Sequence, residues 1–325
     1  MSHFDVFNGD ADGICALQQL RLDAPRESVA ITGVKRDIAL LRRVAARAGD
    51  SVTVLDVSLA RNRDALDELL ARGVAVEYFD HHFAGDVPRH PLLQAHLDPA
   101  PDVCTSVLVD RHLQGRQRAW AVVGAFGDNL PDTAQALADA LGLARGQRDA
   151  LRMLGEAINY NAYGESEEDL LVAPARLAAM LRPYQDPLAF AAESPAARAL
   201  AHQQGEDLAS AFAVRPDPVS PGASMYLLPD APWARRVQGA FANALSQRDR
   251  ERAHAVLCPR RGGDYVVSVR APVAQPRGAD RLCLAFATGG GRAGSAGIDT
   301  LPPERLEEFA RAVATAFPGI PGKQK

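Results

Sequence analysis

The sequence predicts an α/β protein whose N-terminal domain is built on a parallel sheet with helices on both faces. Short runs of β-branched and aromatic residues alternate with longer stretches in which apolar residues recur at helical spacing. Acidic residues and histidines follow directly after these short runs. Because the loops after parallel strands meet at one edge of a sheet, we expect a ligand site at that edge.

The expected elements alternate from the N-terminus. Strands are predicted at 4–7, 29–34, 52–55 and 74–79, and helices at 13–22 and 59–72. Asp10 and Asp12 then lie on the first strand-to-helix turn, and Asp56 follows the strand at 52–55. The strand at 74–79 delivers Asp80, His81 and His82. The apolar run 119–126 is taken as a further strand, which places Asp128 at the same edge.

These residues form a set of oxygen and nitrogen ligands without a thiolate: Asp10, Asp12, Asp56, His81 and Asp128. Such a set suits Mn²⁺ or Mg²⁺ and, less well, Zn²⁺. Crowded carboxylates repel one another unless a cation neutralises them. Five ligands exceed what one structural zinc needs and suit two ions about 3.5–4 Å apart, which activate a water and neutralise a phosphoryl oxygen. The predicted reaction is hydrolysis of a phosphate ester.

The four motifs resemble those of the DHH phosphoesterase family, which includes nanoRNases, single-strand-specific 5′ exonucleases, cyclic-dinucleotide phosphodiesterases and family II inorganic pyrophosphatases. The resemblance covers nearly the whole chain, and the motifs stand in the family's order: Asp10 with Asp12, then Asp56, then Asp80-His81-His82, then Asp128. It implies that Asp56 bridges two metals, that Asp10 leans to the first ion, and that Asp12, His81 and Asp128 hold the second. His82 would face the phosphate or leaving group, with Asp80 supporting the site from outside.

The C-terminal third resembles the DHH-associated C-terminal domain. Residues 282–288 are predicted as a strand, and the glycine-rich run 289–297 follows it. Glycine runs expose backbone N–H groups that can cradle an anion. The resemblance implies that Gly289, Gly290, Gly291 and Arg292 bind the substrate phosphate or base and face the metal cleft from a separate lobe.

Two residues depart from the family's pattern. Asn8 stands where related branches carry a His or Asp that completes the first ion's shell. An amide oxygen is a weaker ligand than a carboxylate, so we expect the first ion to be held loosely or to arrive with substrate. Arg292 stands where the glycine motif normally carries His. Its guanidinium matches phosphate geometry but excludes proton transfer from that position.

Proline and charge divide the chain. Residues 215–222 hold three prolines and a glycine and are predicted as a linker between a DHH domain at 1–214 and a C-terminal domain at 223–325. The Ala- and Leu-rich stretch 133–212 is predicted as helices that complete the first domain. The net charge is −10 over 1–222 and +6 over 223–325. An anionic substrate is therefore expected between an acidic lobe and a basic lobe.

Composition indicates a cytoplasmic enzyme. The chain has no basic, apolar leader and no apolar stretch long enough to span a bilayer. Its four cysteines are scattered and are expected to be reduced and buried. A net charge of −4 argues against coating of long duplexes, whose binding rests on many phosphate contacts. Disorder is expected only at the tail 322–325, and a homodimer is left open.

The leading hypothesis is a Mn²⁺-dependent phosphodiesterase, with Mg²⁺ or Co²⁺ as possible substitutes, that hydrolyses short oligonucleotides or dinucleotides. One alternative is a phosphomonoesterase acting on a 3′,5′-bisphosphorylated nucleoside. Another is a nucleotide-binding sensor with weak hydrolysis, suggested by Asn8 and Arg292. Lys35 and Arg36 are interpreted as solvated surface rather than substrate guides. Asp102, Thr105 and Ser106 are interpreted as caps of the helix that follows rather than phosphate contacts.

Overall fold

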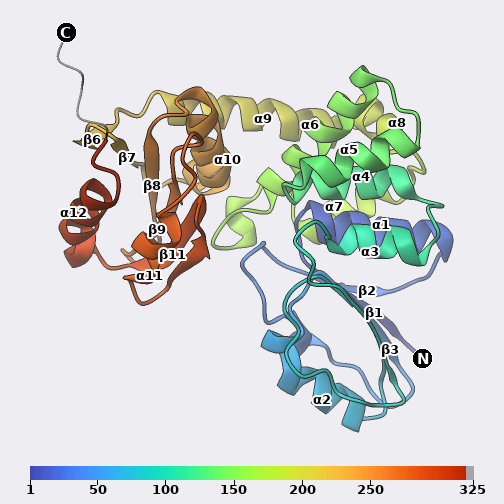
Figure 1. The fold of residues 1–325 in the computed structure, drawn as a ribbon. Helices are drawn as coiled ribbons and strands as arrows, with labels where there is room; N and C mark the ends of the chain where they lie inside the picture. The colour runs from blue at the N-terminus through green and yellow to red at the C-terminus, as the bar shows by residue number, and fades with distance from the viewer. Residues whose placement is uncertain (320–325) are drawn as a thin grey trace. The chain divides into compact units, whose positions relative to one another are not determined.

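The computed structural model describes residues 1–319 and confirms the α/β class (Figure 1). The chain divides into two compact units between Gln203 and Gln204. Each unit contains its own sheet and its own hydrophobic core. The tail 322–325, for which disorder is predicted, lies outside the described residues.

The first unit contains a five-stranded sheet in the order β2-β1-β3-β4-β5, and every neighbouring pair is parallel. Its strands are β1 (His3–Phe7), β2 (Val29–Ile31), β3 (Ser51–Leu55), β4 (Ala75–Asp80) and β5 (Leu93–Leu97). The predicted strands at 4–7, 52–55 and 74–79 are confirmed within a residue or two, whereas the strand predicted at 29–34 ends at Ile31. Strand β5 carries no metal-ligand motif and was not predicted.

Helices cover both faces of this sheet, as predicted. Helix α1 (Ala11–Asp23) packs on the face that carries Phe7 and Leu55, and α2 (Arg63–Ala71) packs on the face that carries Val6 and Val54. The chain therefore leaves β1 and β3 in opposite directions. A sheet with this strand order opens a crevice at the carboxyl ends of those two strands, where ligands bind.

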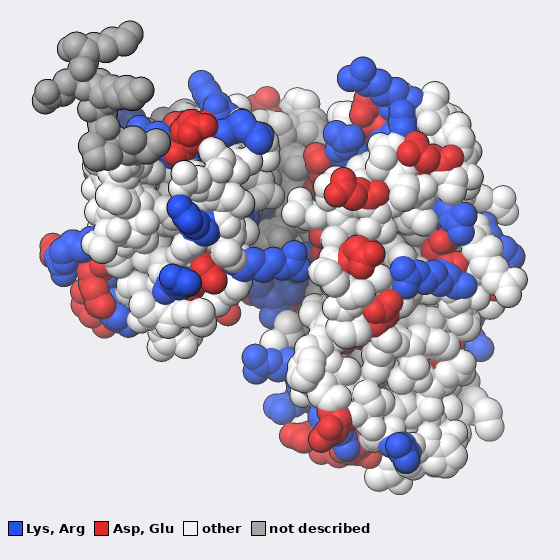
Figure 2. Space-filling view, in the orientation of Figure 1, with Lys and Arg blue, Asp and Glu red and all other residues white. Residues whose placement is uncertain are grey.

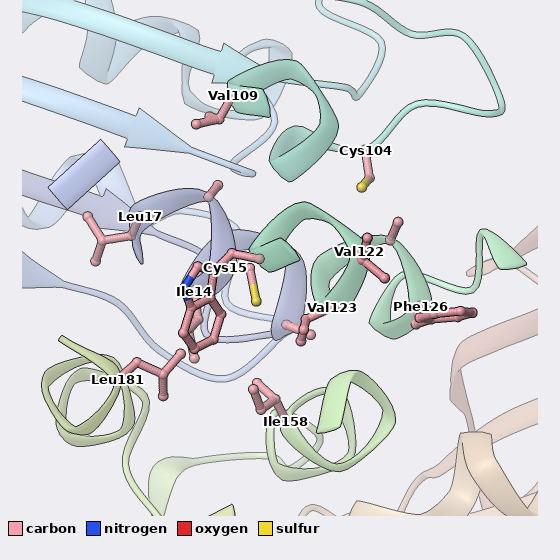
Figure 3. Packing of buried hydrophobic residues seen from close by; sticks show 14 of the residues in the cluster. Ile14, Cys15, Leu17, Cys104, Val109, Val122, Val123, Phe126, Ile158 and Leu181 are labelled. Atoms are coloured by element: carbon pink, nitrogen blue, oxygen red, sulfur yellow. The ribbon is translucent and has the colours of Figure 1, made fainter. Parts of the chain in front are cut away.

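Helix α1 is enclosed on nearly all sides, and all ten residues from Ala11 to Leu20 are buried. Figure 3 shows Ile14, Cys15 and Leu17 of this helix among side chains from neighbouring helices. Helix α1 contacts α3 (Thr105–His112), α4 (Arg118–Gly127), α6 (Arg145–Asn161) and α7 (Pro174–Leu181). The unit also contains α5 (Pro131–Ala140) and α8 (Pro187–Glu193). The predicted helical stretch at 133–212 is thereby confirmed. All four cysteines are buried and free, also as predicted.

Two apolar runs were predicted as strands, but 119–126 is helical, and 282–288 is helical to Leu284 and then forms a turn. Residues 119–126 belong to α4, and residues 279–284 form α11 (Ala279–Leu284). A short, continuous apolar run does not distinguish a buried strand from a buried helix by periodicity. The run 282–288 has a single β-branched residue, Thr288, and is otherwise Leu, Ala, Phe and Cys, which favours a helix. Asp128 accordingly follows the end of a helix and not of a strand.

The second unit contains a six-stranded sheet in the order β10-β11-β9-β8-β7-β6, in which only the β7–β8 pair is parallel. Its strands are β6 (Asp217–Ser220), β7 (Ala223–Leu227), β8 (Ala253–Pro259), β9 (Tyr265–Arg270), β10 (Gly289–Arg292) and β11 (Ser295–Leu301). Helix α10 (Pro232–Arg248) packs on β8 and β9, while α11 and α12 (Leu306–Ala316) pack into the core cluster of this sheet.

The division between the two units falls within a helix. Helix α9 (Pro195–Phe212) contains the division at Gln203 and Gln204. Strand β6 lies within the segment 215–222 and pairs with β7. None of the helices in residues 1–319 combines the length and the apolar character needed to cross a bilayer.

Candidate metal centre

The site is assembled at the carboxyl ends of four neighbouring strands of the first unit. Lys35 follows β2, Asp10 and Asp12 follow β1, Asp56 follows β3, and Asp80, His81 and His82 lie at the end of β4 and just beyond it. Asp128 joins them from the C-terminal end of α4. The ligands predicted from the sequence are thus brought to one edge of the sheet.

Two groups of side chains offer three ligand atoms each within 4.8 Å of one another: Asp12, His81 and Asp128, and Asp56, His81 and His82. His81 belongs to both groups. Its Nε2 lies 3.4 Å from Asp56 Oδ1 and 3.9 Å from Asp128 Oδ2. This mixture of carboxylate and imidazole ligands fits a divalent ion of the Mn²⁺ or Mg²⁺ type.

Close packing brings Asp128 to the start of α1. Gly127 lies against Ala11, and a Cβ added at Gly127 would be 2.3 Å from the Ala11 Cβ. Only glycine allows this approach of the two helices. Asn129 then adopts a φ of 61°, which ends the helix after Asp128.

Asp12 is fixed by a helix terminus from far along the chain. Its Oδ2 accepts a hydrogen bond from the Thr105 N–H, and its Oδ1 accepts one from the Ser106 N–H, each at 2.7 Å. The Ser106 hydroxyl also donates to Asp12. Asp12 therefore caps the start of α3. The sequence had suggested instead that the side chain of Asp102, Thr105 or Ser106 would do so.

Asp56 is held in an uncommon backbone conformation. Its φ is 57°, in the left-handed region, and its N–H donates to the Phe79 carbonyl at 3.1 Å. Burial, together with the charges of Asp10, Asp12 and Asp128, raises the pKa of Asp56 well above its usual value. Strain and crowded negative charge at one residue are typical of a functional site.

Asp128 experiences the same crowding. Burial raises its pKa to about 6, with Asp12 and Asp10 adding to the rise and Lys35 opposing it. We call Asp10, Asp12, Asp56 and Asp128 the acidic cluster. A divalent cation among these carboxylates would relieve the repulsion that raises the pKa of Asp56 and Asp128, so the cluster fits a metal.

Asp80 orients the His82 ring by hydrogen bonding. His82 Nδ1 lies 2.6 Å from Asp80 Oδ1, which also accepts a hydrogen bond from the His82 N–H at 3.2 Å. Asp80 Oδ2 accepts from the Leu59 N–H at 3.2 Å. The hydrogen bond to Asp80 raises the pKa of His82, partly offset by burial. The His82 side chain is 44% exposed, so its Nε2 remains available to a substrate.

Lys35, interpreted from the sequence as solvated surface, is part of the site. Its Nζ lies 2.5 Å from Asp10 Oδ2, 3.1 Å from Asn159 Oδ1 and 3.6 Å from Asp128 Oδ1. Burial lowers the pKa of Lys35, but the charges of Asp10, Tyr163 and Asp128 outweigh this and raise it well above its ordinary value. The sequence signal was its position after a predicted strand, but nothing local showed that β2 lies beside β1.

Asn8 and Asp10 bind the surrounding backbone. The Asn8 Oδ1 accepts a hydrogen bond from the Asp10 N–H at 3.2 Å, and its Nδ2 donates to the Lys35 carbonyl at 3.3 Å. Asp10 Oδ1 caps α1 by accepting from the Gly13 N–H at 3.0 Å. Burial raises the pKa of Asp10, but the charge of Lys35 and hydrogen bonds with Lys35, Gly13 and Asp56 leave it below its usual value.

A pocket of about 320 Å³ opens over the centre. Its lining includes Asp10, Lys35, Asp56 and His82, and also Arg61, an exposed cation in the 3₁₀ turn before α2. Basic and acidic side chains are interspersed on the face of the molecule in Figure 2. The pocket therefore combines acidic ligands with two local cations.

The glycine run of the second unit forms a strand where a loop was expected. Gly289–Arg292 is β10, the edge strand of its sheet, paired antiparallel with β11. A Cβ added at Gly289 would lie 1.7 Å from the Cys283 carbonyl oxygen, whereas Gly290 has open space beside it. Arg292 is exposed at the end of the strand. Arg236, part of the basic excess, is buried and paired with Asp207.

Comparison with solved structures identifies the class of fold. No protein-family model matches the chain, and a search of curated proteins finds no match. The chain is similar to the exonuclease RecJ bound to manganese, with a TM-score of 0.53 and 19% identity over 97% of this chain and 90% of that one. It is also similar to RecJ of Thermus thermophilus in complex with Mn²⁺, with a TM-score of 0.58 and 21% identity over 98% of this chain and 52% of that one.

A third similar structure is the pGpG-specific phosphodiesterase PggH from Vibrio, with a TM-score of 0.56 and 13% identity over 97% of this chain and 98% of that one. RecJ and PggH are both members of the DHH phosphoesterase family. The chain has their two-domain fold, so the resemblance inferred from the motifs is confirmed at the level of the fold. At these identities the likeness does not extend to a branch of the family.

Proposed function

We propose that this chain is a metal-dependent phosphodiesterase of the DHH family that hydrolyses short oligonucleotides or dinucleotides. The observation that carries the proposal is the acidic cluster with His81, gathered at the carboxyl ends of adjacent parallel strands and the end of α4. The shared fold with a manganese-bound exonuclease and a dinucleotide phosphodiesterase supports it. Mn²⁺ is the proposed ion, and the prediction of two ions from the motifs remains a prediction.

The chemistry follows from the arrangement of the side chains. A bound ion would activate water and neutralise charge on a phosphoryl oxygen. Asp12 and Asp128 would hold it with His81, and Asp56 would stand beside them. His82 would donate a proton from Nε2 to the departing oxygen, because its Nδ1 is bound by Asp80 and its raised pKa favours the protonated ring.

The expected substrate is small and anionic. A pocket of about 320 Å³ fits one nucleotide unit with its phosphate rather than a long duplex. Lys35 and Arg61 provide positive charge at the pocket. A net charge of −4 also disfavours binding that rests on many phosphate contacts. Binding of a substrate phosphate or base by Gly289, Gly290, Gly291 and Arg292 is a separate proposal, made from the resemblance alone.

The test is hydrolysis of a panel of short RNA and DNA oligonucleotides, linear and cyclic dinucleotides and 3′,5′-bisphosphorylated adenosine, each with added Mn²⁺. The control is Asp56→Asn, because asparagine tolerates the positive φ of this position. We expect mononucleotide release that disappears in the control. Phosphate released from the bisphosphorylated nucleoside alone would favour the phosphomonoesterase, and binding without turnover would favour the sensor.

A further inference from the structure

The side chains expected to hold the first ion and those expected to hold the second ion have different partners within the protein. The set expected for the second ion, Asp12, His81 and Asp128, has its ligand atoms converging within 4.8 Å. The set expected for the first ion is Asn8 and Asp10, together with Asp56, which was expected to bridge both ions. Asp10 belongs to no converging group of Asp, Glu, His and Cys side chains among residues 1–319.

Asp12 accepts hydrogen bonds at both carboxylate oxygens from neutral groups of Thr105 and Ser106, whereas Asp10 is paired with a cation. Asp10 Oδ1 accepts from the Gly13 N–H at 3.0 Å, and Oδ2 lies 2.5 Å from the Lys35 ammonium. The side chain is almost fully buried, so the ammonium is its main source of compensating charge. An ion at Asp10 would have to displace a cation that is already bound there.

Hydrogen bonds hold both the backbone and the side chain of Lys35. Its backbone N–H donates to the Ala162 carbonyl at 2.9 Å, and its carbonyl accepts from Asn8 Nδ2 at 3.3 Å. Its Nζ also lies 3.1 Å from Asn159 Oδ1. The side chain is 25% exposed, and the ammonium lies among protein oxygens. Such a lysine is a built part of the centre rather than a mobile surface charge.

Asn8 completes the arrangement. Its amide oxygen accepts from the Asp10 N–H and its amide nitrogen holds the Lys35 backbone, so both ends of the amide are engaged. A carboxylate at position 8 has no N–H to donate to the Lys35 carbonyl. The departure at Asn8 and the presence of Lys35 are therefore two parts of one feature.

We infer that Lys35 occupies the place of the first metal ion, so that this centre binds a single divalent ion at Asp12, His81 and Asp128. This inference rests on the proposed function and sharpens it. The ammonium supplies a fixed positive charge beside the pocket but cannot activate water as a metal does. Asp128 lies between Lys35 and His81, with Oδ1 3.6 Å from Lys35 Nζ and Oδ2 3.9 Å from His81 Nε2.

The experiment counts ions without measuring turnover. The metal-free full chain is titrated with Mn²⁺, the bound ion is counted by equilibrium dialysis and metal analysis, and electron paramagnetic resonance distinguishes an isolated ion from a coupled pair. We expect one ion per chain and the six-line spectrum of an isolated Mn²⁺. Two ions with a coupled spectrum would overturn the inference and leave the proposed function standing. Absence of binding would overturn both.

Two matched isosteric variants test the assignment. Asp10→Asn retains a good helix N-cap, so it should fold. It should keep one ion with an affinity within about tenfold of the unaltered protein, because Asp10 is not a ligand. Asp128→Asn removes a ligand and should weaken Mn²⁺ binding by about 100-fold or more. Equal losses in the two variants, or loss of one of two ions in Asp10→Asn, would contradict the inference.

Replacement of the lysine tests the substitution directly. Lys35→Met should gain a second, weaker Mn²⁺ with spin coupling to the first, because Asp10 is then uncompensated. Arg61→Met is the control, since it removes a cation from the same pocket without touching Asp10, and it should bind one ion. A folded Lys35→Met protein, verified by circular dichroism, that binds one ion only would overturn the role of Lys35.

Discussion

The buried carboxylate of Asp5 in strand β1 and the acidic cluster beside the end of that strand differ in how the protein compensates their charge. Asp5, in the middle of β1, is fully buried and accepts hydrogen bonds from Arg21 Nε at 3.0 Å and from Ser28 Oγ at 2.6 Å. Burial would raise the pKa of Asp5, but hydrogen bonds from His3, Arg21 and Ser28 hold it far below its usual value. At the end of the same strand, Lys35 pairs with Asp10 of the acidic cluster, yet the pKa of Asp56 is raised.

The difference separates stability from function. The Asp5 site is electrostatically complete within the chain, so it contributes to the fold. The acidic cluster is incomplete, so its folded form holds repulsion that a bound cation would relieve. The following four predictions test this contrast, beginning with the largest expected effect.

Asp5→Asn should lower the free energy of unfolding by about 3–5 kcal/mol, because it leaves the Arg21 guanidinium buried without its carboxylate. The measurement is urea denaturation in EDTA. Asp67→Asn is the control, since its pair with Arg63 is exposed and should contribute less than about 1 kcal/mol. Equal losses in the two variants would remove the distinction between the sites. Mn²⁺ binding by Asp5→Asn should be unchanged.

Asp80→Asn should lower turnover about 10- to 100-fold, or roughly 1.4–2.8 kcal/mol, by releasing His82 from its orientation. The pKa of His82, measured by nuclear magnetic resonance, should fall because the carboxylate that raises it is gone. The double variant Asp80→Asn/His82→Ala should lose no more than His82→Ala. Additive losses would show that Asp80 acts independently of His82.

Asp56→Asn should change metal-free stability in the direction opposite to Asp5→Asn. Removing one charge from the acidic cluster should raise the free energy of unfolding in EDTA, by on the order of 1 kcal/mol. Asparagine also tolerates the positive φ at this position. A loss of several kcal/mol would mean that Asp56 is compensated within the protein, which would contradict the contrast.

The two regions should also respond oppositely to pH. In the metal-free folded chain the pKa of Asp128 is about 6, against 3.8 for the free group. Protonation of Asp128 therefore stabilises the folded state below about pH 4, and this stabilisation is lost as the pH rises from about 4 to 6. The pKa of Asp5 is depressed, so its contribution is present above about pH 4 and is lost as the pH falls further. Denaturation across this range with Asp128→Asn and Asp5→Asn isolates each contribution. Matching slopes would refute the assignment.

Much of the site was predictable because its signals are local. Strands β1, β3 and β4 are short runs of β-branched and aromatic residues, and parallel topology alone brings their carboxyl ends together. Asp56, His81 and His82 therefore converge as their order in the sequence indicates. The approach of α4 through Gly127 was hidden, because an apolar run surrounded by other helices has no periodic pattern.

By itself, the sequence determined the class of fold, the first-unit strands that carry the motifs and the candidate ligands, since periodicity and motif spacing are properties of neighbouring residues. Only the tertiary structure decided how those ligands are compensated. Asp12 is bound by the start of α3, 93 residues away, and Asp10 by Lys35, 25 residues away. Such partners are chosen when distant segments pack together, because a buried charge must find its counter-charge or hydrogen bonds in space and not along the chain.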